Sequence, residues 1–427
     1  MPNNEKQPQV VTFGCRLNIY ESEIIKSHLA TNGLDDAIVF NTCAVTNEAE
    51  RQARQSIRKI KRENPNAKII VTGCSAQINP QMYADMPEVD RVLGNKEKML
   101  ADSYDPKDER SMVVSDIMQL KESAHHLISG FESKVRAFIE IQNGCDHRCT
   151  FCTIPFGRGN NRSIPVAQIV NQVQALVDSG SKEIIFTGVD ITGYGGDLPG
   201  KPTLGQMLRR VFTQVPDLPR LRLSSLDPAE LDEDVYRLIA DEPRLMPHFH
   251  ISLQSGDNMI LKRMKRRHLR DDIIVFCKSV RELRPDAIFG ADIIAGFPTE
   301  TDEMHQNSMK ILRECDIAIV HAFPFSPRKS TPASRMPQVP TSIVKARAAQ
   351  LRAIGEENYQ KFLTSWVGKT VSVLLQRDGE AYSTHYAPVF VPELANSPDL
   401  IGEIFDIYIT GKTDKNLIGQ LKLKQVA

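Results

Sequence analysis

Short apolar runs alternate with stretches of helical periodicity through the first third of the chain. The short runs are typical of strands buried on both faces, and the longer stretches are typical of helices that cover a sheet. This alternation predicts a βαβαβ arrangement and hence a parallel sheet. The expected strands cover 10–13, 37–40 and 68–71, and the expected helices cover 20–32 and 47–63.

Strand and helix patterns continue to alternate through the middle of the chain. Such repeats predict a partial or full TIM-like barrel, whose working face is built from the loops that follow the strands. The expected strands cover 136–141, 183–186, 221–224, 250–253, 291–294 and 317–320.

Beyond a charged helix expected over 341–362, single apolar and polar residues alternate. A period of two predicts strands, and the shortness of these strands predicts a small β-barrel. Residues 101–132 have weak periodicity and many charges, so we expect them to connect two domains. The expected C-terminal strands cover 370–375, 387–391, 404–409 and 417–421.

We therefore expect an α/β protein in three parts: an open parallel-sheet domain over 1–125, a TIM-like barrel over 131–362 and a small β-barrel over 364–427. The 427 residues include 53 basic and 53 acidic ones. This balance argues against bulk coating of nucleic acid, although local basic patches can still bind it. The polar start and the lack of a long apolar run predict a cytoplasmic protein without membrane contact, and we expect a monomer.

Three cysteines lie within one short segment of the expected barrel. They are Cys145, Cys149 and Cys152, with three residues between the first pair and two between the second. Three thiolates at this spacing can hold a [4Fe–4S] cluster in which one iron lacks a protein ligand and is open to a substrate or cofactor. On spacing alone, a partial zinc site or three reduced core cysteines remain as alternatives.

A second set of cysteines lies at the ends of the three expected N-terminal strands. Its members are Cys15, Cys43 and Cys74. Because the carboxyl ends of parallel strands share one edge of a sheet, these residues are expected to be neighbours. Gly14 and Gly73 would let the backbone turn sharply beside a bulky inorganic group. Three buried cysteines are the alternative, but this placement favours a second cluster with an open iron.

Small and polar residues follow the strands of the expected barrel. Glycines there permit close approach of a ligand, and Asp190, Ser225 and Gln254 could bond an amino group, a carboxylate or ribose hydroxyls. Turn chemistry explains glycine and serine after strands about as well. The candidates are Gly188, Asp190, Ser225, Gln254 and Gly296.

Two basic segments could contact phosphates. In the helix expected over 47–63, spacings of three and four place several basic residues on one face, and no acid lies between Arg51 and Arg62. A solvated face is the alternative, although such faces usually include acids. The basic residues of this face are Arg51, Arg54, Arg58 and Lys61. The second segment contains Lys262, Arg263, Lys265, Arg266, Arg267 and Arg270.

A strand that leads into the three-cysteine loop, with Phe151 before the last cysteine, resembles the radical S-adenosylmethionine enzymes. The resemblance implies that the cofactor's methionyl group chelates the open iron. It also implies that an electron from the cluster cleaves the cofactor to give a 5′-deoxyadenosyl radical. Phe151 and the five strand-end candidates would then bind the cofactor.

The N-terminal cysteines narrow the resemblance to the methylthiotransferases, and it extends over essentially the whole chain. Within that family, 41–47 and 187–195 look most like the enzymes that modify threonylcarbamoyladenosine in tRNA. The segments that carry the family resemblance are 13–15, 41–43, 72–77, 254–256, 292–298 and 325–328.

The resemblance implies a tRNA methylthiotransferase that replaces the hydrogen on carbon 2 of N6-threonylcarbamoyladenosine at position 37, beside the anticodon. Cys145, Cys149 and Cys152 would hold the radical-generating [4Fe–4S] cluster, and the N-terminal set would hold an auxiliary [4Fe–4S] cluster that carries sulfur. The implied partners are S-adenosyl-L-methionine, the tRNA anticodon loop, a flavodoxin- or ferredoxin-like electron donor and a sulfur donor. The C-terminal barrel resembles the family's RNA-binding barrel, or it covers the central domain.

Two other functions remain open. One is a methylthiotransferase for isopentenyladenosine tRNA or a ribosomal-protein aspartate; the other is a non-catalytic RNA-binding protein with structural metal. The sequence also departs from the usual family residues at three places. These are Thr299, where glycine usually follows Phe-Pro, Lys329-Ser330, where a glycine usually precedes Thr331, and His250-Ile251-Ser252.

Overall fold

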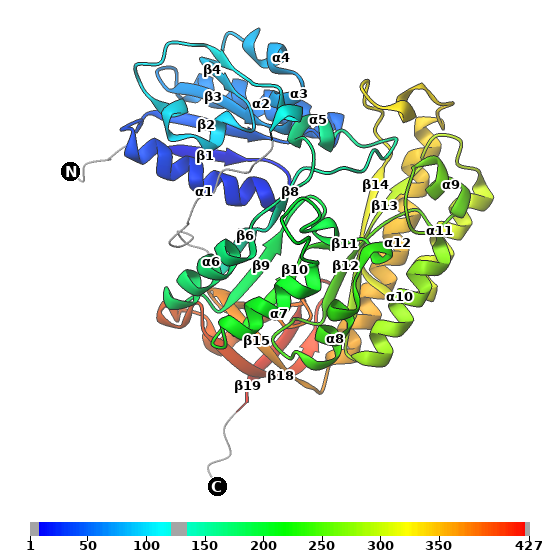
Figure 1. The fold of residues 1–427 in the computed structure, drawn as a ribbon. Coiled ribbons are helices and arrows are strands. Elements are labelled where there is room, and N and C mark those ends of the chain that lie inside the picture. The colour runs from blue at the N-terminus through cyan, green and yellow to red at the C-terminus, as the bar shows by residue number, and fades with distance from the viewer. Residues whose placement is uncertain (1–7, 121–134, 423–427) are drawn as a thin grey trace.

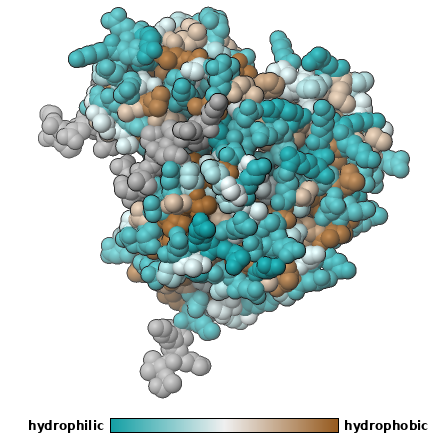
Figure 2. All heavy atoms as spheres, in the orientation of Figure 1, coloured by the Kyte–Doolittle hydropathy of each residue, from teal (hydrophilic) through white to brown (hydrophobic). Residues whose placement is uncertain are grey.

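The computed structural model describes residues 8–120 and 135–422. Figure 1 shows an N-terminal α/β layer at one end, a larger strand-and-helix unit in the middle, and a small β-barrel at the other end. On the face drawn in Figure 2, hydrophilic residues cover most of the surface and hydrophobic ones lie in scattered patches. Among the described residues, no helix has the length and apolar character needed to cross a membrane.

Five parallel strands form the N-terminal sheet in the order β1-β2-β3-β4-β5. Its elements are β1 (Gln9–Thr12), α1 (Arg16–Thr31), β2 (Ala37–Thr42), α2 (Asn47–Glu63), β3 (Lys68–Gly73), α3 (Cys74–Ile78), α4 (Pro80–Ala84), β4 (Arg91–Leu93) and β5 (Met112–Val113). Phe40 of β2 packs with Ile57 of α2 on one face of the sheet. The preceding residue, Val39, points to the other face and packs with Ile25 of α1. Helices therefore cover both faces of the parallel sheet, and the order of β1 to β3 with α1 and α2 matches the predicted βαβαβ arrangement.

The expectation that 101–132 only connects domains is wrong for its described part. Met112–Val113 forms the edge strand β5, which pairs with β4. Both strands are too short to show a clear apolar periodicity. In addition, β4 buries a charged residue, Arg91, which forms an ion pair with Asp108. Residues 121–132 of the expected connection lie outside the described residues.

The central unit is an open barrel of parallel strands. Its strands are β6 (Arg136–Glu140), β9 (Glu183–Thr187), β10 (Arg220–Leu223), β11 (Ser225–Leu226), β12 (His248–Gln254), β13 (Ile288–Ala295) and β14 (Ile317–Pro324). They form the sheets β10-β9-β6 and β11-β12-β13-β14, and only Ser224 separates β10 from β11. Within the described residues β6 and β14 do not pair, so the predicted TIM-like barrel is a partial one.

Helices cover the outside of this barrel, and two short elements lie at its cysteine loop. The outer helices are α6 (Val166–Asp178), α7 (Leu204–Gln214), α8 (Glu233–Asp241), α9 (Asn258–Arg263), α10 (Arg270–Leu283), α11 (Asp302–Glu314) and α12 (Thr341–Trp366). At the loop are the antiparallel pair β7 (Gln142–Asn143) and β8 (Arg162–Ser163) and the helix α5 (Ile154–Arg158). One apolar core joins the strands to most of the outer helices.

The C-terminal strands close into a barrel in the order β15-β16-β17-β19-β18, as predicted. They are β15 (Thr370–Arg377), β16 (Glu380–Ser383), β17 (Pro388–Phe390), β18 (Ile404–Lys412) and β19 (Leu417–Leu421), of which the sequence analysis missed β16. The predicted boundary near 362–364 falls inside α12, which continues to Trp366. The other predicted boundary, at 125–131, lies outside the described residues.

Tyr386, between β16 and β17, joins all three parts of the protein. Its ring stacks on His248 of β12 at 5.0 Å, and the guanidinium of Arg222 in β10 lies 5.1 Å from the ring centre. Arg16 of α1 donates to its hydroxyl at 3.2 Å. The C-terminal barrel therefore covers the amino-terminal end of the central barrel, and RNA binding by it stays a prediction.

Replacing Tyr386 by alanine should lower the free energy of unfolding by about 3 kcal/mol, because the ring fills the joint between three parts of the chain. Tyr386→Phe keeps the ring and loses only the hydrogen bonds of the hydroxyl with Arg16 and Arg136, so it should cost about 1 kcal/mol. Urea unfolding followed by fluorescence measures both. Equal losses in the two variants would contradict the packing role of the ring.

Candidate functional site

The loop that carries Cys145, Cys149 and Cys152 is closed at its base by β7 and β8. It starts at Gly144, where φ is +70° and a Cβ would lie 1.9 Å from the Asn160 carbonyl oxygen. Only glycine fits this turn. The Cys152 amide donates to the Cys149 carbonyl at 3.1 Å, so the loop folds back and brings its three cysteines together.

Charged side chains reach two sulfur atoms of this loop. Asp190 Oδ2 lies 3.8 Å from Cys145 Sγ and 2.7 Å from His147 Nε2. Arg266 Nη1 lies 3.6 Å from Cys149 Sγ. Burial raises the pKa of Asp190, but the hydrogen bond and charge of His147 outweigh it, so the pKa is lowered and the carboxylate stays ionised.

Burial favours the neutral form of the loop thiols. It raises the pKa of Cys152 to about 12, and it raises the pKa of Cys145 with a further contribution from Asp190. Arg266 acts in the opposite direction on Cys152. Such thiols keep their protons until a cation replaces them, so metal binding here would release protons.

The second set of cysteines lies at the carboxyl edge of the N-terminal sheet. Cys15 directly precedes α1, Cys43 directly follows β2, and Cys74 begins α3. A Cβ on Gly14 would lie 2.7 Å from the Cys43 sulfur, so this glycine lets two strand ends approach each other. Burial raises the pKa of Cys43 to about 12, and the neighbouring Cys74 thiol adds to the rise. The three residues are neighbours in the fold.

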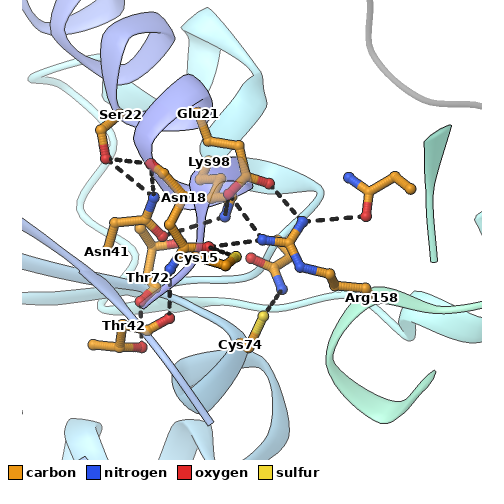
Figure 3. A network of polar contacts seen from close by, with 12 residues as sticks. Cys15, Asn18, Glu21, Ser22, Asn41, Thr42, Thr72, Cys74, Lys98 and Arg158 are labelled. Atoms are coloured by element: carbon orange, nitrogen blue, oxygen red, sulfur yellow. Dashed lines mark hydrogen bonds and ion pairs between the residues drawn. The ribbon is translucent and has the colours of Figure 1, made fainter. Parts of the chain in front are cut away.

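Arg158 is a buried cation beside this edge. Its guanidinium pairs with Glu21 at 2.9 Å and donates to Asn18 Oδ1 at 2.7 Å. Glu21 also pairs with Lys98 at 2.6 Å, and the charged side chains of this network are at most 2% exposed. Figure 3 shows the network next to Cys15. Buried charges are tolerated only when paired in this way.

The helix α5 brings the two cysteine sets together. It starts at Ile154, just after Cys152, and a Cβ on Gly157 would lie only 3.2 Å from the Cys74 Cβ. Asn95 donates to the Gly157 carbonyl at 2.5 Å and lies 3.7 Å from the Cys74 sulfur. The two sets therefore meet across one helical turn.

The donor chemistry of both sets fits iron–sulfur clusters. Each offers three thiols, and a guanidinium, Arg158 or Arg266, lies beside each to balance thiolate and cluster charge. Cys145, His147 and Asp190 also offer ligand atoms within 4.8 Å of one another. Zinc could use such a set, but His147 and Asp190 are already bonded to each other.

Two of the strand-end candidates face protein atoms. A Cβ on Gly188 would lie 2.7 Å from Ile191, and a Cβ on Gly296 would lie 2.5 Å from Val344. Packing against these residues is enough to require glycine at both positions. Phe151 lies edge-on to Phe297, with ring centres 6.4 Å apart, and packs against an apolar cluster.

Ser225 and Gln254 are the more accessible candidates. Both are half-buried, and neither side chain has a hydrogen-bond partner in the described part of the chain. Gln254 has a φ of +63° at the end of β12. A non-glycine residue in this region is uncommon and is often found at functional sites. Both remain candidate ligand contacts.

The four basic residues predicted on α2 lie at the surface; three of them form ion pairs, and Arg54 contacts the sulfur of Met82. Arg51 and Arg58 are exposed, and Arg54 and Lys61 are half-buried. The acids come from the start of α2 and from a neighbouring loop, which spacing along the helix does not reveal. Because surface ion pairs contribute little, these basic groups can still exchange partners with phosphates. The pairs are Arg51–Glu48, Arg58–Glu88 and Lys61–Asp90.

In the second basic segment, some side chains are exposed and others contact the cysteine loop. Lys262 and Arg267 are exposed, although Arg267 forms an ion pair with Glu230. The side chain of Arg266 is only 10% exposed and lies at the cysteine loop, so in this structure it supports that loop rather than a basic surface.

Arg263 explains one departure from the family pattern. It donates to Thr299 Oγ1 at 2.8 Å. Thr299 has a φ of +70°, a conformation that favours the usual glycine, and the bond from Arg263 supports the threonine there. Lys329 and Ser330, at the second departure, are exposed.

Comparison with known proteins decides the family. A model of the radical SAM superfamily matches residues 139–312, and a model of the uncharacterized protein family UPF0004 matches residues 7–94. The threonylcarbamoyladenosine tRNA methylthiotransferase MtaB of Rickettsia prowazekii (strain Madrid E) is 54% identical over 411 residues, 96% of both chains. The chain belongs to the threonylcarbamoyladenosine tRNA methylthiotransferase family. The resemblance stated from the sequence is thereby confirmed.

More distant relatives agree with this family. MtaB of Aquifex aeolicus (strain VF5) is 35% identical over 88% of this chain and 95% of its own. A tRNA-2-methylthio-N(6)-dimethylallyladenosine synthase of Rickettsia rickettsii (strain Sheila Smith) is 31% identical over 97% of this chain and 99% of its own. Radical SAM methylthiotransferases use S-adenosylmethionine and two [4Fe–4S] clusters, in agreement with the cofactors expected from the sequence.

Among solved structures, the radical S-adenosylmethionine methyltransferase TsrM from Kitasatospora setae has a similar fold. The TM-score is 0.55 at 14% sequence identity, over 77% of this chain and 75% of TsrM. At this identity the match shows the fold alone, and it supports the predicted α/β class.

Several site residues were not predicted from the sequence of this methylthiotransferase. They are Arg158, Glu21, Asn18, Asn95 and His147. Arg158 had a usable signal, since it lies between Gly157 and Gly159 directly after the cysteine loop. No sequence signal identified Glu21 or Asn95, because the residues that they contact are distant in the sequence.

Glu140 gives this region a pH-dependent stability. It lines a cavity of about 210 Å³ together with Glu21 and Arg158, and burial and then the charge of Glu21 raise its pKa to about 7 from 4.5. The native state therefore holds a proton that the unfolded state loses, so stability falls as pH rises from 4.5 to 7. Glu140→Gln should differ from the wild type by no more than about 1 kcal/mol near pH 5 and exceed it at pH 8, by up to ~3 kcal/mol.

Urea unfolding of both proteins at the two pH values measures this difference. A variant that is equally destabilised at pH 5 and pH 8 would show that Glu140 is ionised in the native state.

Proposed function

We propose that this protein is a tRNA methylthiotransferase that places a methylthio group on carbon 2 of N6-threonylcarbamoyladenosine at position 37. The observation that carries the proposal is the meeting of two three-cysteine sets across α5, where Gly157 approaches Cys74. A single radical enzyme needs one such set, whereas radical formation combined with sulfur delivery needs two. The names of the relatives that are similar over nearly the whole chain support the same substrate.

The two sets have different roles in this proposal. Cys145, Cys149 and Cys152 would hold the cluster that, with S-adenosylmethionine, supplies a 5′-deoxyadenosyl radical, and the N-terminal set would hold the cluster that supplies sulfur. Asp190 contacts the sulfur of Cys145 and Arg266 contacts that of Cys149, so these two side chains set the local charge at the first set. Arg158 does so for the second. Ser225 and Gln254 are the proposed polar contacts of the cofactor.

The substrate base must leave its stack in the anticodon loop to reach a site between two domains. Exposed basic groups of α2, with Lys262 and Arg267 on the central unit, would hold the flanking phosphates. The proposal includes a one-electron donor and a sulfur donor as transient partners, a monomeric protein and a cytoplasmic location.

A methylthiotransferase for dimethylallyladenosine is the second candidate. A dimethylallyladenosine synthase that is 31% identical to this chain supports it. The MtaB relative is 54% identical over a comparable share of the chain, which favours the first candidate. Both candidates share the two cysteine sets, so the choice between them depends on the residues that face the base.

Two single substitutions test the division of labour between the sets. Cys149→Ala should abolish 5′-deoxyadenosine formation, because one cluster ligand is lost. Cys43→Ala should retain this cleavage yet give no methylthio product, because only the sulfur-carrying set is damaged. Anaerobically reconstituted proteins are assayed with reductant, S-adenosylmethionine and tRNA that carries threonylcarbamoyladenosine at position 37. Mass spectrometry follows 5′-deoxyadenosine and the methylthiolated nucleoside. Cys277→Ala, which alters a buried cysteine outside both sets, is the control.

Loss of cleavage in Cys43→Ala to the same degree as in Cys149→Ala would contradict the separate roles. Absence of cleavage in the wild type would favour the non-catalytic alternative.

A further inference from the structure

A cluster of histidines around one aspartate lies on three neighbouring barrel strands. His250 of β12 and His321 of β14 contact the same oxygen of Asp292 of β13, at 3.1 and 3.2 Å. The two imidazole rings are 5.0 Å apart. Neither the cysteine sets nor the strand-end candidates include these residues.

These side chains face the inside of the barrel. The residues that alternate with them on β12, Phe249 and Ile251, belong to the apolar core shared with the outer helices. In a strand, successive side chains point to opposite faces, so His248 and His250 point inward. Tyr386 confirms the direction, because it contacts both His248 and Arg222, which come from different sheets of the barrel.

The side chains of this cluster differ in solvent exposure, from His321 at the exposed end to His248 at the buried end. The side chain of His321 is 53% exposed, that of Asp292 28% and that of His250 12%. His248, below them, is buried against Tyr386. The polar side chains therefore extend from the exposed His321 to the buried His248.

The buried end lacks hydrogen-bond partners. Both ring nitrogens of His248 are buried without a partner among the described residues. Gly290 of β13 makes room here, because a Cβ would lie 2.6 Å from His250 Nδ1 and 3.4 Å from His248 Nε2. Buried polar atoms without partners are rare in native proteins and indicate a missing ligand or water.

The surroundings carry an excess of positive charge. Arg222 pairs with Glu183 at 3.0 Å, whereas Arg16 and Arg136 have no carboxylate partner within the described residues. Burial and then the charges of Arg222, His250 and Arg16 hold the pKa of His248 well below its usual value. An anionic group would be stabilised in this environment.

The position of the cluster relates it to the cysteine loop. Arg266 contacts both Cys149 Sγ and the carbonyl of Ser252, at 3.6 and 3.2 Å. Ser252 is two residues beyond His250 on the same strand, which is about 7 Å. The polar cluster therefore lies directly below the level at which the loop meets the barrel wall.

We propose that His250, Asp292 and His321, with His248 below them, receive the threonylcarbamoyl group of the substrate base. This inference rests on the proposed function and adds the residues that select the substrate. A threonylcarbamoyl group carries a carboxylate, a hydroxyl, a carbonyl and N–H groups. The histidine rings can donate to its carboxylate, and the second oxygen of Asp292 can accept from its hydroxyl.

The same site disfavours a dimethylallyl group. That group is apolar and offers no hydrogen bonds, so it would exclude water from the second oxygen of Asp292 and from the ring nitrogens that do not contact Asp292. Sites built to hydrogen-bond a substrate discriminate strongly against analogues that lack the polar group.

The test uses one tRNA prepared with three bases at position 37: threonylcarbamoyladenosine, dimethylallyladenosine and unmodified adenosine. Asp292→Asn and His321→Gln are compared with the wild type and with His28→Gln, a histidine of α1 whose ring contacts the Met99 carbonyl outside the barrel. Three quantities are measured: tRNA affinity by fluorescence anisotropy, kcat/KM for methylthiolation, and 5′-deoxyadenosine formation without tRNA.

We expect the wild type and His28→Gln to bind the threonylcarbamoyl tRNA more tightly than the unmodified one. Asp292→Asn and His321→Gln should lose that preference and lower kcat/KM on the order of a hundredfold, mainly through KM. Cofactor cleavage without tRNA should stay unchanged, which also shows that the variants fold.

Unchanged binding preference and kcat/KM in both variants would overturn the inference, and so would a parallel loss of cleavage without tRNA, which would assign the cluster to cofactor binding. The proposed function fails separately, if the wild type methylthiolates the dimethylallyl tRNA and leaves the threonylcarbamoyl tRNA unmodified.

Discussion

The buried ion network around Arg158 is the interaction on which the arrangement of the site depends. Arg158 lies at the end of α5, directly after the cysteine loop of the barrel, and its partner Glu21 lies in the first helix of the N-terminal domain. Removal of Glu21 would leave the buried charges of Arg158 and Lys98 without their carboxylate partner, at a cost of about 3–5 kcal/mol. The network therefore fixes one domain against the other and places Cys74 beside Gly157.

A second constraint is the close contact between the barrel and its two neighbours. Arg328 pairs with Glu50 on the side of the N-terminal domain opposite α1, and Tyr386 joins the C-terminal barrel to β10 and β12. The central barrel is thus closed at its amino-terminal end and faces the other cysteine set at its carboxyl-terminal end. Its inner face carries the polar side chains of His250, Asp292 and His321, so a substrate group that enters beside them must supply hydrogen bonds.

The sequence predicted what local patterns encode. The helix expected over 47–63 matches α2, because helical periodicity runs through that stretch, and the strand-end cysteines meet because parallel strands share one edge. The sequence did not predict β4, whose Arg91 is buried by pairing with Asp108, or the partnership of Arg158 with Glu21. Such contacts depend on the tertiary fold and leave no periodic signal.

The central claim is that the two cysteine sets act together on threonylcarbamoyladenosine. Mass spectrometry of nucleosides from the tRNA of cells that lack this protein tests it most directly. We predict that 2-methylthio-threonylcarbamoyladenosine disappears, that threonylcarbamoyladenosine accumulates in its place, and that methylthiolated dimethylallyladenosine is unaffected. Unchanged methylthiolation of threonylcarbamoyladenosine in those cells would contradict it.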